Sequence, residues 1–123
     1  MKHSEGFLRL VDDAKSRIRE VTVAETQDRL KQNPDAKLID VREDNEFAAA
    51  HAAGATHLGK GIIERDIETT VPDKDAELIL YCGGGYRSAL ATDALQKMGY
   101  TNVWSMDGGW RAWQEAGGDI EQR

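Results

Sequence analysis

The chain has a single cysteine, Cys82, among its 123 residues, and only two prolines. One cysteine cannot form a disulfide within the chain, so Cys82 is a packed thiol, an intermolecular partner or a reactive group. A chain of this length forms one ordinary domain and can bury a hydrophobic core without disulfides or a structural metal. The three histidines are scattered and show no metal-ligand spacing with Cys82, so no metal and no other cofactor is expected.

The sequence also lacks an excess of basic residues and a long apolar run. Its net charge of −6 and isoelectric point near 5.0 argue against nucleic acid or an acidic membrane surface as the main partner. No stretch approaches the roughly 20 apolar residues that span a bilayer, and residues 1–5 lack the apolar run of a secretory signal. We therefore expect a soluble, cytoplasmic protein with no nucleic acid and no membrane among its partners.

What the sequence does contain is an alternation of short apolar runs and amphipathic segments. Strands are predicted at residues 21–23, 37–42, 55–58, 77–81 and 102–106, and helices at 7–19, 24–31, 43–50, 61–69, 87–98 and 110–116. This alternation indicates an α/β fold in which helices cover both faces of a parallel sheet. In such sheets ligands bind beyond the carboxyl ends of the strands, here at 40–42, 81–82 and 106–109.

The segment from Cys82 to Ser88 joins the clearest strand to the clearest helix. The glycines at 83–85 allow backbone conformations closed to other residues, so that several N–H groups can point inward together. The following helix adds the positive end of its dipole, and Arg87 adds a formal charge. These groups would stabilise a thiolate on Cys82, or the anionic outer sulfur of a persulfide. The alternative is a small buried thiol in a tight turn, which three consecutive glycines disfavour.

The order and spacing of four motifs resemble those of the rhodanese-like sulfurtransferases. The motifs are Leu38-Ile39-Asp40-Val41-Arg42; Glu46-Phe47 with the segment 51–58; Cys82-Gly83-Gly84-Gly85-Tyr86-Arg87-Ser88; and Asp107-Gly108-Gly109-Trp110-Arg111-Ala112-Trp113. The resemblance implies a three-layer fold with a central five-stranded parallel sheet and helices on both faces. That domain would occupy residues 21–118, between an N-terminal helical extension at 1–20 and a C-terminal tail at 119–123.

The resemblance also implies roles for particular residues. Cys82 would be catalytic, and the substrate-binding loop would comprise Gly83, Gly84, Gly85, Tyr86, Arg87 and Ser88. Asp40 and Arg42 would either orient this loop or form a local salt bridge or helix cap for residues 43–49. We expect Tyr86 at the pocket mouth, and Arg87 either binding an anion or turned outward to pair with an acid.

The predicted activity is sulfur transfer through a persulfide on Cys82. The donor would be thiosulfate, glutathione persulfide or a similar compound, and the acceptor cyanide, an external thiol or a small redox protein. The acidic surface predicts a high KM for thiosulfate and better activity with organic persulfides. One alternative is a non-catalytic rhodanese-like module that binds a partner. A less favoured one is a cysteine-dependent phosphatase or arsenate reductase, whose loop resembles Cys-x5-Arg, whereas Arg87 completes Cys-x4-Arg here.

Overall fold

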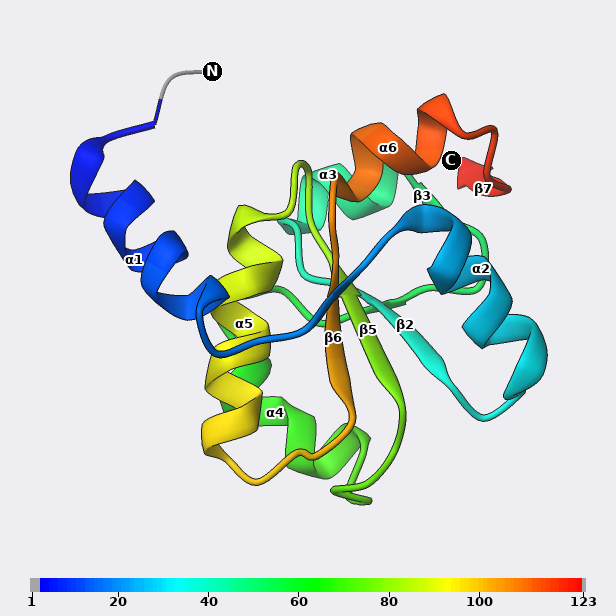
Figure 1. Ribbon diagram of the computed structural model, residues 1–123. Coiled ribbons are helices and arrows are strands. Elements are labelled where there is room, and N and C mark those ends of the chain that lie inside the picture. Colours follow the sequence, from blue (N-terminus) through cyan, green and yellow to red (C-terminus); the bar gives the residue numbers. More distant parts are fainter. Residues whose placement is uncertain (1–2, 123) are drawn as a thin grey trace.

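Five parallel strands form the central sheet of the computed structural model, which describes residues 3–122 (Figure 1). Their order across the sheet is β1–β6–β5–β2–β4, and two further strands, β3 and β7, form a separate antiparallel pair. The strands are β1 (Glu20–Val21), β2 (Lys37–Asp40), β3 (Ala50–Ala52), β4 (Thr56–His57), β5 (Leu78–Tyr81), β6 (Val103–Met106) and β7 (Ile120–Gln122). The helices are α1 (Glu5–Lys15), α2 (Val23–Gln32), α3 (Asp44–Ala49), α4 (Ile63–Thr70), α5 (Tyr86–Lys97) and α6 (Gly109–Glu115).

The predicted α/β fold, with its five-stranded parallel sheet between helices, is confirmed. Alternate residues of each strand enter two separate hydrophobic cores, because successive side chains of a strand point to opposite faces. Leu80 and Cys82 belong to the core under α4 and α5, whereas Ile79 and Tyr81 belong to the core that includes α2 and α6. β5 is buried along its whole length, as a central strand covered on both faces must be.

Several element boundaries differ from the predicted ones. β2 ends at Asp40 rather than Arg42, because the Asp40 carboxylate accepts the backbone N–H of Arg42 at 2.9 Å and turns the chain. α1 ends at Lys15 rather than Arg19, and Ser16 caps it. Thr22 caps α2, within a capping box closed by Glu25.

The sequence analysis missed β3 and β7. Each is three residues long, and they pair so that His51 faces Glu121. The predicted C-terminal tail therefore contains a strand over 120–122 that returns to the domain, while Arg123 lies outside the described residues. Each of these strands pairs with a segment far away in the chain, so no local pattern of polarity reveals it.

α1 packs along α5, outside the layer that covers the sheet (Figure 1). Val11 and Ala14 are buried in this contact, and the Arg17 guanidinium donates to both oxygens of Asp93 on α5 at 2.8 and 3.0 Å. The N-terminal helical extension is therefore anchored to the domain by an apolar stripe and an ion pair. Its first two residues lie outside the described part of the chain.

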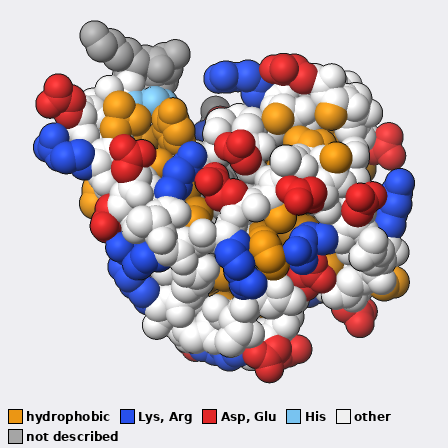
Figure 2. Space-filling model, in the orientation of Figure 1, with side chains coloured by type: hydrophobic (Ala, Val, Ile, Leu, Met, Phe, Trp, Pro, Cys, Tyr) orange, Lys and Arg blue, Asp and Glu red, His pale blue; other side chains and the backbone are white. Residues whose placement is uncertain are grey.

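Figure 2 shows acidic and basic side chains interspersed over one face of the molecule, with apolar side chains gathered beside α1. Within residues 3–122, no helix is long and apolar enough to cross a membrane.

Two leucines on helices provide a matched test of which helix positions are buried in the fold. Leu95 of α5 is fully buried, whereas Leu10 of α1 is 60% exposed. We expect Leu95→Ala to lower the free energy of unfolding by about 2 to 5 kcal/mol, because it leaves a cavity in the core. Leu10→Ala should change it by less than about 0.5 kcal/mol. Urea denaturation of both variants checks this, and equal losses would contradict the described position of α1.

Candidate active site

The sulfur of Cys82 lies in a pocket of backbone N–H groups. The N–H of Gly85 donates to Sγ at 3.1 Å and that of Ser88 at 3.4 Å. The residue is 1% exposed, so these donors act on the sulfur with little competition from water. Such donors favour a negatively charged sulfur over a neutral thiol.

The loop geometry follows from where Cys82 stands in the chain. It comes directly after β5, and α5 begins at Tyr86 with Gly85 as its N-cap. Gly85 has a φ of 104°, in a region that favours glycine, and this turns its N–H toward the sulfur. The first turn of the twelve-residue helix α5 therefore directs the N–H of Ser88 and the positive end of the helix dipole at Sγ. Gly83 is half-buried and Gly84 exposed, so the outer part of the loop is open to solvent.

Two buried hydroxyl groups extend the surroundings of the sulfur. Ser88 Oγ lies 3.6 Å from Sγ and 2.8 Å from Ser105 Oγ, and both serines are fully buried. Ser105 lies on β6, in register with Leu80 of β5, and therefore faces the same core as Cys82. The sequence analysis did not nominate Ser105. The available signal was a polar residue inside an otherwise apolar strand, two residues before the Asp107-Gly108-Gly109 motif.

The N-terminus of α6 supports the loop from the other side. The backbone N–H of Trp110 donates to the carbonyl oxygen of Cys82 at 2.7 Å, and that of Arg111 donates to Gly83 at 3.2 Å. This contact requires a glycine at 109, where φ is 53° and where a Cβ atom would overlap the Cys82 carbonyl. The predicted convergence of 81–82 and 106–109 is thus observed.

Asp40 and Arg42 lie beneath the loop, in a buried network that reaches it through neighbours. Arg42 donates to both oxygens of Asp40 at 2.8 to 3.1 Å, and its guanidinium lies 4.7 Å from the ring centre of Trp110. Burial opposes the charge on Arg42, but the hydrogen bonds to Asp40 and the negative charges around the guanidinium together outweigh it and keep the pKa of Arg42 above its ordinary value. The Tyr81 hydroxyl donates to Asp40 at 2.7 Å, and burial together with the Asp40 charge raises the pKa of Tyr81.

This network contains the local salt bridge that we considered for Asp40 and Arg42. The helix cap that we considered belongs instead to Glu43, whose capping box with Glu46 begins α3. Asp40 pairs in register with Tyr81, the residue before Cys82. The Arg42 guanidinium lies over the ring of Trp110, whose backbone N–H donates to the carbonyl oxygen of Cys82. An orienting role for the two residues remains a prediction.

Arg87 lies over the outer part of the loop and is paired with an acid. A Cβ atom on Gly83 would lie 3.3 Å from the Arg87 Nη2 atom, so the guanidinium rests against the loop. Its Nη1 atom donates to Glu46 Oε1 at 2.9 Å. The hydrogen bond from Arg87 holds the pKa of Glu46 below its ordinary value, and Glu46 raises the pKa of Arg87.

Tyr86 is half-buried between the loop and α1. Its ring lies 4.9 Å from that of His3 and 6.2 Å from that of Phe7, and Lys15 Nζ lies 5.5 Å from its centre. The N-terminal extension therefore contacts a residue of the predicted substrate-binding loop. The sequence of the extension did not predict this contact.

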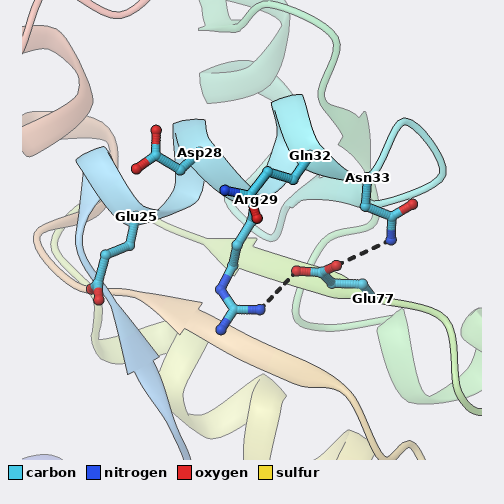
Figure 3. A pocket seen from close by; sticks show the side chains of 6 residues that line it. All are labelled: Glu25, Asp28, Arg29, Gln32, Asn33 and Glu77. Carbon is cyan, nitrogen blue, oxygen red and sulfur yellow. Dashed lines mark hydrogen bonds and ion pairs between the residues drawn. The ribbon is translucent and has the colours of Figure 1, made fainter.

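A surface hollow beside α2 lies away from Cys82. It has a volume of about 500 Å³ and is lined by Glu25, Asp28, Arg29, Gln32, Asn33 and Glu77 (Figure 3). Glu77 precedes β5 whereas Cys82 follows it, so the length of the strand separates them. Arg29 and Asn33 both donate to Glu77, at 2.8 and 3.1 Å, and this satisfies its carboxylate. Within residues 3–122, no three His, Cys, Asp or Glu side chains are grouped as metal ligands.

A family model described as the rhodanese-like domain matches residues 22–116, which include β5, the Cys82 loop and α6. The chain belongs to the rhodanese-like family. The match covers nearly all of the domain predicted at 21–118.

Named relatives of this rhodanese-like protein carry different functional descriptions. Thiosulfate sulfurtransferase GlpE of Pseudomonas entomophila is 35% identical over 79 residues, which cover 64% of this chain and 71% of GlpE. The structure of a Rhodopseudomonas palustris protein of unknown function, described as a possible tyrosine phosphatase, is 30% identical, with a TM-score of 0.85 over 98% of both chains. The polysulfide-sulfur transferase homodimer of Wolinella succinogenes is 26% identical, with a TM-score of 0.82 over 96% of this chain and 88% of the other. The family thus includes sulfurtransferases with differently named donors.

Gly109 provides a test of the contact between α6 and the loop. We expect Gly109→Ala to destabilise the protein by about 2 to 4 kcal/mol, because a side chain is strained at this φ and overlaps the Cys82 carbonyl. It should also change the rate at which Cys82 reacts with a thiol reagent in the folded protein. Gly61→Ala is the matched control, since a Cβ atom there meets nothing within 4 Å. Equal stability of the two variants in urea would refute the close approach.

Proposed function

We propose that this protein is a sulfurtransferase that carries a sulfane sulfur atom as a persulfide on Cys82. The observation that carries the proposal is the pair of backbone N–H groups, of Gly85 and Ser88, that donate to Sγ. Two such donors stabilise an anionic sulfur, which is the attacking species in thiophilic displacement. Membership of a family that includes named sulfurtransferases supports the same reaction.

The cycle consists of two displacements. The Cys82 thiolate attacks the outer sulfur of a donor such as thiosulfate; the Cys82 S–S bond forms, the donor S–S bond breaks, and sulfite leaves with the electron pair. A nucleophile such as cyanide or a thiolate then attacks the outer sulfur of the persulfide, which releases the product and restores the Cys82 thiolate. Since Cys82 is the only cysteine, the acceptor comes from outside the chain. We place this reaction in the cytoplasm, where low-molecular-weight thiols are abundant.

Phosphatase activity is the second candidate, and the Rhodopseudomonas palustris relative favours it. A phosphatase loop must surround a tetrahedral group with several oxygens. Here Arg87 follows Cys82 by five positions, one fewer than in the Cys-x5-Arg pattern, and its guanidinium is bound to Glu46. A shorter loop with a paired arginine fits one sulfur atom better than a phosphate group.

Intact-protein mass spectrometry tests the persulfide directly. Incubation with thiosulfate or glutathione persulfide should add the mass of one sulfur atom to the wild-type protein, and cyanide or a thiol should remove it. Cys82→Ser should gain nothing, because it lacks the attacking sulfur.

The outcomes separate the candidate functions. If the folded wild type gains no sulfur from either donor, the sulfurtransferase proposal is wrong, and hydrolysis of a phosphate ester is the next assay. If neither reaction occurs, a partner-binding rhodanese-like module remains.

A further inference from the structure

The ion pair between Arg87 and Glu46 lies at the outer, solvent-exposed part of the Cys82 loop, which we call its opening. This pair determines the charge at the opening. Arg87 lies against Gly83 on one side of this opening, and the Glu46 carboxylate from α3 binds it through two nitrogens, at 2.9 and 3.4 Å. Both side chains are about one-third exposed, so they lie at the surface of the site rather than in the core. The pair thus occupies the position where an incoming anion would meet Arg87.

Glu46 is held in this position by its own helix. Its Oε1 atom also accepts the backbone N–H of Glu43 at 2.9 Å, within the capping box of α3. The carboxylate therefore does not depend on Arg87 alone for its orientation. A second carboxylate, that of Asp107, lies near the loop, since a Cβ atom on Gly85 would be 3.8 Å from its Oδ1 atom.

The charges of Arg87, Glu46 and Asp107 together disfavour the approach of an anionic substrate. Arg87 alone would attract an anionic substrate, but Glu46 cancels its charge and Asp107 adds a negative one. The repulsion of a substrate grows in proportion to its charge, so a dianion such as thiosulfate is affected about twice as strongly, in free energy, as a monoanion.

From this geometry we infer that Glu46 is a specificity-determining residue, which disfavours small inorganic dianions such as thiosulfate as donors relative to monoanionic organic persulfides. The inference rests on the proposed sulfurtransferase function for its choice of substrate. The effect of Glu46 on anions at Cys82 can be measured without that function.

The first experiment compares the alkylation of Cys82 by iodoacetate, an anion, and by neutral iodoacetamide. Glu46→Gln keeps the capping acceptor but removes the charge. At low ionic strength we expect it to raise the ratio of the iodoacetate rate to the iodoacetamide rate about 3-fold, and added salt should reduce this gain. Glu64→Gln makes the same change in net charge on α4, away from the loop, and should leave the ratio unchanged (Figure 1).

The second experiment measures sulfur transfer. For Glu46→Gln we expect kcat/KM to rise about 10-fold with thiosulfate, roughly the square of the monoanion effect, and only about 3-fold with an alkyl persulfide donor, which is a monoanion. Arg87→Gln should act in the opposite direction on both the alkylation ratio and thiosulfate turnover.

The outcomes of the two experiments distinguish a wrong role for Glu46 from a wrong proposed function. An unchanged alkylation ratio in Glu46→Gln overturns the role of Glu46, whatever the activity. A raised ratio without sulfur transfer from any donor overturns the proposed function but retains the effect of Glu46 on anions. Equal gains for thiosulfate and the alkyl persulfide would show that Glu46 does not discriminate by charge.

Discussion

The close approach of α6 to the carbonyl of Cys82 is the contact on which the rest of the site depends. It brings the N–H of Trp110 to the Cys82 carbonyl and thereby fixes the peptide at which the loop leaves β5. Because that carbonyl is bound from outside, the following residues can turn their N–H groups inward to the sulfur. A glycine at 109 makes this approach sterically feasible. The backbone contact between α6 and the loop thus helps to position the N–H groups that donate to the Cys82 sulfur.

The site combines a buried inner part with an exposed rim. In the inner part, backbone donors and the hydroxyls of Ser88 and Ser105 surround the sulfur, in a region where electrostatic interactions are strong. At the rim, Arg87 and Glu46 are partly exposed and screened by solvent and salt. The inner groups therefore act on the Cys82 sulfur itself, whereas the charged groups at the rim act on an approaching substrate.

The buried Asp40–Arg42 pair connects two parts of the structure. Asp40 accepts from Tyr81, at the end of the strand that carries Cys82, and Arg42 stacks on Trp110 of α6. Removing either member would leave the other charge buried without its partner, which generally costs several kcal/mol. The pair thereby links the end of β5 to the start of α6, the two elements between which the loop is held.

The sequence by itself determined the class of fold, the order of its main elements and the position of Cys82 between the central strand and the helix that follows it. These depend on local patterns: alternating apolar runs predict a parallel sheet, and consecutive glycines after a buried strand predict a loop of backbone donors. Only the tertiary structure decided that Arg87 pairs with Glu46, that Ser105 lies behind Ser88, and that α1 reaches Tyr86. Those contacts join residues 17 to 79 positions apart in the chain, and their geometry depends on how helices pack on the sheet. The short strands β3 and β7 have the same origin, since each exists only through its pairing with the other.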